Sequence, residues 1–487
     1  MPYPTLEEVK AIAAKGDYRT VPVSTEILSD SRTPIALLSV LKNVSDHCFL
    51  LESAADAEKW GRYTFLSFDP KLAITCTDGN MRVGERFCRT DCPNKYIREV
   101  LRAYRSPRLP GLPPFTGGLV GYFSFDYLKY SEPSLHLDAT DPEGFRDVDL
   151  MLFDRVIAFD HLRQKIVLIV SMDLSDPETN YKRAERELSE LSRLIRTGQP
   201  KEEPPGHLAG EFSQLFHKDR FCTIVEKAKE HIREGDVFQI VPSNLLSAPF
   251  EGTLLNVYRT LRMLNPSPYM FYFSSPDLEV AGASPETLVK LDNGVLHTFP
   301  LAGTRRRGKT ETEDAVLEAE LLTDSKELAE HNMLVDLGRN DLGKISKFGT
   351  VEIEKLHSVE RFSHVMHLGS TIRSEIRNDC DALDAISAVL PAGTLSGAPK
   401  LRACQLINEL EGSKRGIYGG AIGYLDFNGD LDTCIGIRLA YKKNGKVFIR
   451  SGAGIVADSI PENEYQECMN KAAAVIAALK EAEGVDL

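Results

Sequence analysis

Short runs of β-branched and aromatic residues, separated by turn signals, constrain the fold of this chain more than any other feature. Early runs include HCFLLES, RYTFLSF, KLAITC, GGLVGYFSFDY and KIVLIVSM, and such runs are typical of strands. Farther along, residues 419–427, 432–442 and 446–455 are joined by Asn428-Gly429 and Asn444-Gly445. Because Asn-Gly between apolar runs is a strong hairpin signal, we expect these segments to form antiparallel hairpins.

Helical patterns alternate with these strands. Apolar residues recur at helical spacing in the segments 177–196, 217–234, 313–337, 380–388, 400–410 and 462–483. Since a sheet buries its apolar face only against another layer, the sequence predicts an α+β fold in which helices cover sheets.

One segment, 197–213, reads TGQPKEEPPGHLAGEFS and lies between two predicted helices. A stretch this rich in proline, glycine and glutamate is typical of a linker. We expect an N-terminal region (1–200), a linker (201–213) and a C-terminal region (214–487).

The charge balance narrows the possible partners. The chain carries 58 lysines and arginines against 71 aspartates and glutamates, a formal net charge of −13, whereas proteins that bind nucleic acids or anionic membranes present basic faces. No stretch approaches the length of an apolar membrane span, and no signal peptide is evident. We therefore expect small-molecule chemistry in the cytoplasm, with no nucleic-acid or membrane partner.

Two pairs of glutamates stand three residues apart in helical patterns: Glu327 with Glu330, and Glu464 with Glu467. Positions i and i+3 share a helix face, so each pair presents two carboxylates side by side. A solvated helix face is one interpretation. Apolar neighbours on both helices favour burial instead, and buried carboxylates require a partner or a metal. Together the pairs could hold a hard cation such as Mg²⁺.

A series of polar motifs surrounds these pairs. In order, they are ASPET (283–287), PLAGTR (300–305), HVMHL (364–368), PAGTLSGAPK (391–400), GIYGG (416–420), IR (437–438) and SGAG (451–454). Their order and spacing resemble the chorismate-utilising enzymes, and within them the large, synthase subunits (component I) of anthranilate synthases. The resemblance implies a layered α/β/β/α sandwich of two antiparallel sheets covered by helices.

The resemblance also implies a Mg²⁺ site. Glu330 and Glu467 would bind the ion, and Glu327 and Glu464 would support it through water. Chorismate carries two carboxylates, which four glutamates would repel unless a divalent cation lay between them.

A second set of residues is implied to hold the substrate. An Arg fork suits a carboxylate, and glycines let backbone N–H groups approach an anion closely. The implied substrate-binding residues are Gly303, Thr304, Tyr418, Arg438, Gly452, Ala453, Gly454 and Lys471, with 452–454 acting through their amides.

For proton transfer the family resemblance implies Glu286, His367 and Thr394. Loss of the C4 hydroxyl of chorismate needs an acid, a role suited to a glutamate with a raised pKa, and we assign it to Glu286. His367 would orient the substrate or assist the later elimination, and Thr394 would hydrogen-bond near the hydroxyl.

Two positions distinguish reactions within the family. Gln239 stands where relatives that add water carry a lysine, and a glutamine cannot act as that base. Ala302 stands where aminodeoxychorismate synthases carry a nucleophilic lysine. We therefore expect ammonia to add at C2, giving 2-amino-2-deoxyisochorismate, which then loses pyruvate to give anthranilate, the first committed step of tryptophan biosynthesis. An aminodeoxychorismate synthase and a catalytically silent tryptophan-binding paralogue remain alternatives.

The expected partners follow from the cysteines and from a second pair of motifs. Cys404 and Cys434 lie in helix and strand patterns, unlike the nucleophile of a class I glutamine amidotransferase, so ammonia is expected from a separate amidotransferase subunit, component II, in a hetero-oligomer. The motifs LLES (50–53) and NPSPYM (265–270) resemble the family's tryptophan feedback site. The implied contacts with the inhibitor L-tryptophan are Leu51, Glu52, Ser53, Pro268, Tyr269 and Met270.

Overall fold

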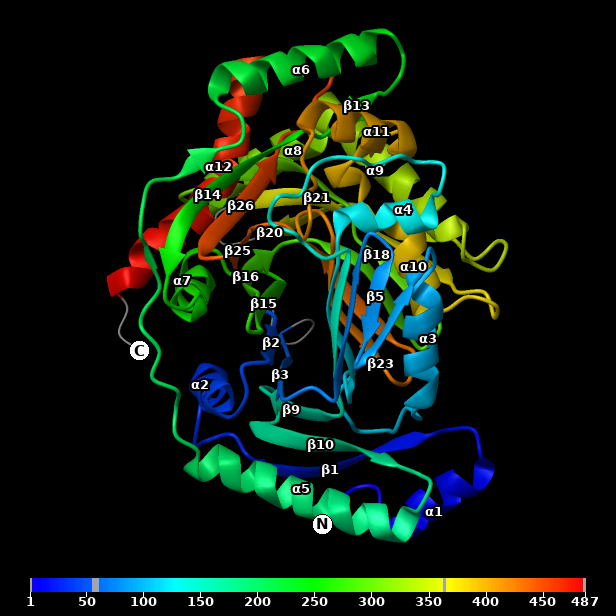
Figure 1. Cartoon of the computed structure of the whole chain (residues 1–487). Coiled ribbons are helices and arrows are strands. Elements are labelled where there is room, and N and C mark those ends of the chain that lie inside the picture. The colour runs from blue at the N-terminus through cyan, green and yellow to red at the C-terminus, as the bar shows by residue number, and fades with distance from the viewer. Residues whose placement is uncertain (1, 55–60, 362–364, 485–487) are drawn as a thin grey trace.

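The computed structural model describes residues 2–54, 61–361 and 365–484. His364 of the HVMHL motif lies outside these residues, as does Trp60, which stands two residues before the run RYTFLSF. Two large antiparallel sheets dominate the architecture, and helices cover their outer faces (Figure 1).

The first sheet runs from the N-terminal strand to the linker. Its strands, in spatial order, are β1 (Thr20–Leu28), β10 (Lys165–Asp173), β9 (Arg155–Asp160), β3 (Tyr63–Phe68), β2 (Cys48–Glu52), β15 (Tyr269–Ser274), β16 (Glu279–Ser284), β25 (Leu439–Lys443), β26 (Lys446–Gly452), β14 (Ser243–Glu251) and β11 (His207–Leu208), with β12 (Ser213–Gln214) also paired to β14.

The second sheet faces the first. Its strands, in spatial order, are β19 (Leu301–Arg306), β21 (Val365–Glu375), β18 (Val295–Thr298), β17 (Thr287–Asp292), β24 (Leu431–Ile435), β23 (Ala421–Asp426), β7 (Gly118–Phe123), β8 (Val148–Phe153), β4 (Leu72–Thr77), β5 (Asn80–Val83) and β6 (Arg86–Arg89), with β20 (Glu352–Arg361) also paired to β21. A separate short pair joins β13 (Gln239–Ile240) to β22 (Gly397–Ala398).

Helices form the outer layers. They are α1 (Leu6–Lys15), α2 (Pro34–Val44), α3 (Pro93–Ala103), α4 (Leu128–Ser131), α5 (Pro177–Thr197), α6 (Lys218–Arg233), α7 (Leu255–Leu264), α8 (Glu311–Thr323), α9 (Ser325–Gly343), α10 (Ala382–Val389), α11 (Lys400–Glu411) and α12 (Pro461–Glu481). None of the described helices has both the length and the hydrophobicity that a bilayer span requires.

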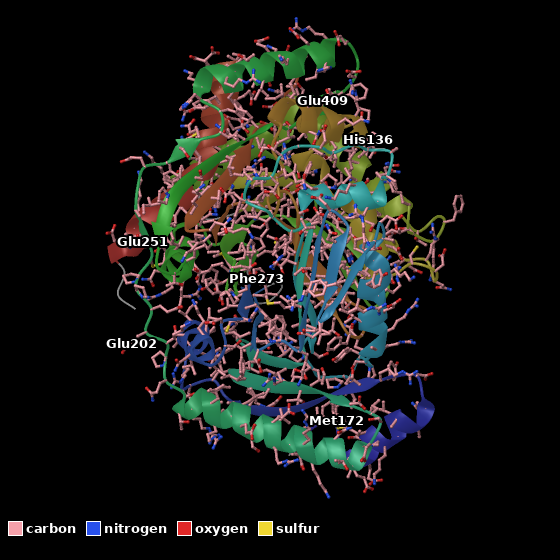
Figure 2. All side chains as sticks on the ribbon, viewed as in Figure 1. His136, Met172, Glu202, Glu251, Phe273 and Glu409 are labelled. Carbon is pink, nitrogen blue, oxygen red and sulfur yellow. The ribbon has the colours of Figure 1, made fainter. Side chains whose placement is uncertain are left out.

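Alternating side chains explain the layers. On β2, Leu50 packs in the core beneath α2, α5 and α7, whereas Phe49 points into the aromatic core between the sheets. On β15, Tyr272 joins the first of these cores and Phe273 the second; Figure 2 labels Phe273 in the interior. Because successive residues of a strand face opposite sides, both faces of this sheet are buried. The predicted layered sandwich is confirmed.

The predicted strand 432–442 is corrected by the structure. The two Asn-Gly hairpins form, since β23 pairs with β24 and β25 pairs with β26. Between them, however, the chain leaves β24 in the second sheet and enters β25 in the first. Arg438 lies at this crossing with a φ of 55°, in the left-handed region that interrupts a strand.

The predicted helix 313–337 is likewise two helices. α8 ends at Thr323 and α9 begins at Ser325. Asp324 caps α9, because its side chain accepts hydrogen bonds from the amides of Lys326 and Glu327. A side chain that satisfies these free amides favours a new helix start over continuation.

Each sheet contains strands from both the N-terminal and the C-terminal side of the predicted linker. β2 from the N-terminal region pairs with β15 from the C-terminal region, and β7 pairs with β23. The two regions therefore share their sheets and their cores.

Candidate active site

A cavity of about 670 Å³ is lined by β19, β21, β26, α9 and α12. Almost all of the predicted catalytic, substrate-binding and metal-binding residues face it. They are Gln239, Glu286, Gly303, Thr304, Glu327, Glu330, His367, Thr394, Tyr418, Arg438, Gly452, Gly454, Glu464, Glu467 and Lys471. Residues that are far apart in the sequence, from Gln239 to Lys471, thus meet in one place.

Ala453 is the one predicted residue of this set that does not line the cavity. It is fully buried in the core around α6 and α11. Its amide donates to the carbonyl oxygen of Pro242 at 3.2 Å. The N–H group expected to meet a carboxylate is therefore already engaged.

The two glutamate pairs project from α9 and α12 into this cavity. Three of them have a polar partner close by: Glu327 lies 3.1 Å from Arg305 Nη1, Glu330 accepts from Gln239 Nε2 at 3.1 Å, and Glu467 lies 2.7 Å from Lys471 Nζ. The two helices thus present both pairs to the same cavity.

Burial makes this cluster of carboxylates electrostatically costly. Desolvation raises the pKa of Glu330, and the neighbouring charge of Glu327 raises it further. Desolvation likewise raises the pKa of Glu464, with a contribution from Glu467. A cation between the helices would relieve both effects.

The donor set fits Mg²⁺ in chemistry. Carboxylate oxygens are hard ligands, and Mg²⁺ is usually held by one or two protein carboxylates while waters and substrate oxygens complete its shell. Among the described residues, only one group of three possible metal ligands has its ligand atoms within 4.8 Å of one another, and it lies outside this cavity. No three of the four glutamates are therefore that close to one another. An open site with one glutamate from each helix matches this preference.

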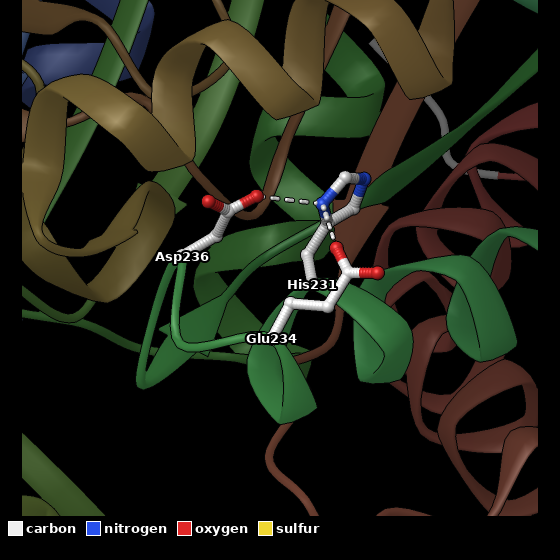
Figure 3. Close-up of side chains that lie close together, drawn as sticks. All are labelled: His231, Glu234 and Asp236. Carbon is white, nitrogen blue, oxygen red and sulfur yellow. Dashed lines mark hydrogen bonds and ion pairs between the residues drawn. The ribbon is translucent and has the colours of Figure 1, made fainter.

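That other group comprises His231, Glu234 and Asp236 at the end of α6 (Figure 3). His231 Nδ1 lies 2.8 Å from Asp236, and the Arg402 guanidinium lies 2.7 Å from the same carboxylate oxygen. Hydrogen bonds from Arg402 and then from His231 lower the pKa of Asp236. Because the guanidinium of Arg402 already pairs with the Asp236 carboxylate, we interpret the group as an ion pair that stabilises the end of α6.

Glu286 and Thr394 form a buried pair in the cavity. The Thr394 hydroxyl lies 3.3 and 3.4 Å from the two carboxyl oxygens of Glu286. Burial raises the pKa of Glu286 to about 8. At neutral pH this side chain therefore holds a proton, as a general acid must.

His367 is held in one orientation on β21. Its Nδ1 lies 2.9 Å from the carbonyl oxygen of Gly303 and 3.1 Å from the hydroxyl of Thr304. A carbonyl only accepts, so Nδ1 carries the hydrogen. Desolvation lowers the pKa of His367, so the ring is neutral and Nε2 is its basic nitrogen.

Gly303 makes this arrangement possible. β19 shifts register between Ala302 and Thr304, and Gly303 has a φ of 61°. An added Cβ would come within 3.1 Å of the Glu327 carboxylate. A glycine is therefore required where β19 approaches α9.

Positive and hydroxyl groups also line the cavity. Arg438 donates to the backbone carbonyl of Lys471 at 2.7 Å, and Lys471 Nζ also contacts the carbonyl of Gly452 at 3.1 Å. A Cβ at Gly452 would lie 3.0 Å from the Tyr418 hydroxyl. The backbone at Gly452 thus lies close to two polar side chains, Lys471 and Tyr418, that suit an anion.

Sequence reasoning missed Arg450, which also lines the cavity. Arg450 and Arg415 both pair with the buried carboxylate of Glu411, at 2.9 and 2.5 Å. Two features of the sequence could have indicated Arg450: it ends the apolar run KVFIR, and Glu411 and Arg415, its partner and a second arginine, stand four residues apart earlier in the chain.

The six predicted effector residues lie outside this cavity but close to one another. β2 and β15 are paired, with Glu52 opposite Met270, and the amide of Ala54 donates to Ser267 at 3.0 Å. Glu52 also receives hydrogen bonds from Tyr258 at 2.5 Å and Arg262 at 3.3 Å on α7. The segments 50–53 and 268–270, more than 200 residues apart in the sequence, therefore form one local structure.

Residues 46–477 match the family model of the chorismate binding enzymes. The chain belongs to this family. It is 44% identical to anthranilate synthase component 1 of Acetivibrio thermocellus over 492 residues, covering 99% of each chain. Among solved structures, anthranilate synthase component I from Streptococcus pneumoniae superposes with a TM-score of 0.77 at 37% identity, over 85% of this chain and 92% of that one.

A menaquinone-specific isochorismate synthase from Escherichia coli has a TM-score of 0.70 at 21% identity, over 97% of this chain and 98% of that one. That likeness shows the shared fold. Within the chorismate binding enzymes, the chain groups with the component 1 proteins of anthranilate synthase.

Replacing Glu286 by glutamine should change how stability depends on pH. The folded protein keeps a proton on Glu286 up to about pH 8, whereas the unfolded chain releases it near 4.5. Between these values the folded state binds more protons, so the free energy of unfolding should fall as pH rises, by about 1.4 kcal/mol per pH unit from this group. Urea denaturation at several pH values should show a flatter dependence for Glu286→Gln. Equal slopes would contradict the protonated, buried carboxyl.

Proposed function

We propose that this chain is the synthase subunit of an anthranilate synthase: its cavity binds chorismate with Mg²⁺ and converts chorismate and ammonia to anthranilate and pyruvate. The observation that carries the proposal is the meeting of the α9 and α12 glutamates with Arg438, Tyr418 and Lys471 in one cavity. One part of this cavity suits a cation, and the other suits the carboxylates of chorismate.

Glu330 and Glu467 would hold the ion, one from each helix, with Glu327 and Glu464 behind them. Bound Mg²⁺ would neutralise the ring carboxylate and withdraw electron density from the ring. Lys471, now 2.7 Å from Glu467, would yield that carboxylate to the ion and turn toward the substrate.

Arg438 and Tyr418 would bind the enolpyruvyl carboxylate, together with the amides of Gly452 and Gly454. A guanidinium supplies a fixed pair of donors for such a group. Burial lowers the pKa of Arg438, but it remains charged near neutrality, and the low local dielectric strengthens its attraction for a carboxylate.

Glu286 would protonate the departing C4 hydroxyl, which leaves as water while ammonia bonds to C2. The ammonium group formed at C2 would then release one proton to solvent and become the amine. Thr394 would keep the carboxyl aligned. His367, neutral and fixed through Nδ1, presents a ring nitrogen that can accept the C2 proton as pyruvate leaves. This elimination restores aromaticity and gives anthranilate.

Gln239 and Ala302 support ammonia as the nucleophile and its direct addition. Neither side chain can act as a base or form a bond to the ring. The Gln239 amide nitrogen donates to Glu330, and its buried Oε1 has no hydrogen-bond partner among the described residues. Ammonia is a donor that would satisfy this oxygen.

The source of ammonia would be a separate glutamine-hydrolysing subunit in a hetero-oligomer. Burial raises the pKa of Cys404 to about 12 and that of Cys434 also upward, so neither thiol is poised as a nucleophile. The described cysteines are all free, which fits the cytoplasmic location that we propose.

Residues 50–53 and 268–270 would form the tryptophan feedback site. The pairing of β2 with β15 supports this proposal, because it puts the end of β2 beside the start of β15 in the middle of the first sheet. Tryptophan bound there would touch both the N-terminal and the C-terminal region.

The direct test of the reaction uses the purified chain alone. With chorismate, Mg²⁺ and an ammonium salt at alkaline pH, fluorescent anthranilate and pyruvate should form in equal amounts. EDTA should abolish both products, and glutamine should not replace ammonium. Accumulation of aminodeoxychorismate would favour the alternative synthase, and tryptophan binding without turnover would favour a silent paralogue.

Ser53→Phe should weaken inhibition by tryptophan at least tenfold, because the added ring fills space beside the paired strands. The concentration giving half-inhibition measures this effect. Ammonia-dependent turnover without tryptophan serves as the control for folding. Unchanged inhibition in a normally active variant would remove Ser53 from the effector site.

A further inference from the structure

We propose that three hydrogen-bonded side chains, Tyr269, Thr287 and Asp432, couple the effector segment to the catalytic groups. The inference rests on the proposed function for the identity of the effector and of Glu286. The triad itself joins the two sheets: Tyr269 belongs to β15 in the first sheet, and Thr287 and Asp432 belong to β17 and β24 in the second.

The direction of the hydrogen bonds follows from their chemistry. The Tyr269 hydroxyl lies 2.9 Å from Thr287 Oγ1 and 2.9 Å from Asp432 Oδ1. The Tyr269 hydroxyl donates its single proton to Asp432, so it accepts the proton of Thr287. Loss of either outer group would leave a buried polar atom without this partner, which makes the three side chains a unit.

One arm of the triad reaches the proposed acid. Thr287 directly follows Glu286 and begins β17, whose register with β24 shifts between Thr287 and Val289. Such bulges redirect side chains beside active sites. The carbonyl of Glu286 accepts from the amide of Ile435 at 3.0 Å, so the backbone that carries the Glu286 side chain is held both by this bond and by its neighbour Thr287.

The other arm reaches the substrate-binding arginine. After Asp432 the chain leaves β24 at Ile435 and crosses to the first sheet through Arg438. The carbonyl of Arg438 accepts from the amide of Ala283 at 3.0 Å, and Ala283 lies on β16, which pairs directly with β15. Glu286 and Arg438 therefore stand on segments that converge on the strand of Tyr269.

A ligand that shifts β15 against β2 would move the Tyr269 hydroxyl and, through it, both arms. Tryptophan would then disfavour the arrangement of Glu286 and Arg438 that binds chorismate. By linkage, chorismate would weaken tryptophan binding by the same factor.

The test replaces Thr287, the outer group of the triad that lies on the catalytic side, and leaves the side chains of Glu286 and of the effector segments unchanged. Thr287→Val removes the hydroxyl and keeps the shape, Thr287→Ser keeps the hydroxyl, and Thr433→Val is the matched control. Thr433 is a buried neighbour of Asp432 whose hydroxyl donates to Val289 at 2.9 Å. Tryptophan affinity is measured by calorimetry without chorismate, and the KM for chorismate is measured with and without saturating tryptophan.

Thr287→Val should bind tryptophan with an affinity within about threefold of the wild-type value. The factor by which saturating tryptophan raises the KM for chorismate should be at least fivefold smaller in Thr287→Val than in the wild type, since couplings of this kind are about 5- to 150-fold. Thr287→Ser and Thr433→Val should behave as the wild type. Full coupling in Thr287→Val, or an equal loss in Thr433→Val, would overturn the triad. A wild-type chain that binds no tryptophan would overturn the effector site itself and this proposal with it.

Discussion

The repulsion within each of two glutamate pairs, one on α9 and one on α12, is the physical constraint around which the site is built. Burial raises the pKa of Glu330 and Glu464, with neighbouring carboxylates adding to the effect. Arg305, Gln239 and Lys471 each lie against one glutamate of the set. A divalent cation would satisfy the cluster more completely, and it would draw an anionic substrate to the same place.

The fold makes this meeting possible by sharing both sheets between its two regions. α9 packs on β19, and α12 packs on β26, so the two glutamate pairs are attached to different sheets. Glu286 and Arg438 stand where the chain enters one sheet or leaves it for the other. A change in how the two sheets pack would therefore move Glu286 and Arg438, and feedback control requires a structural change of this kind.

Local signals in the sequence predicted much of this structure. The Asn-Gly turns predicted two hairpins, and the spacing of the glutamates predicted that each pair shares one face of a helix. The crossing at Arg438 could not be predicted, because the run CIGIRLAYK has the composition of one continuous strand. The break at Asp324 depends on a cap that competes with an equally helical continuation. Arg450 was missed, and the hydrogen bond of the Ala453 amide was not predicted, because their partners, Glu411 and Pro242, are set only by tertiary contacts.

The most direct test of the shared cation is a double-mutant cycle for metal binding. Mn²⁺ affinity would be measured by calorimetry for the wild type, Glu330→Gln, Glu467→Gln and the double variant. If one ion bridges the two helices, each single change should weaken binding at least tenfold, about 1.4 kcal/mol, and the double variant should lose little more. Additive losses, or full affinity in either single variant, would contradict a site built from both helices.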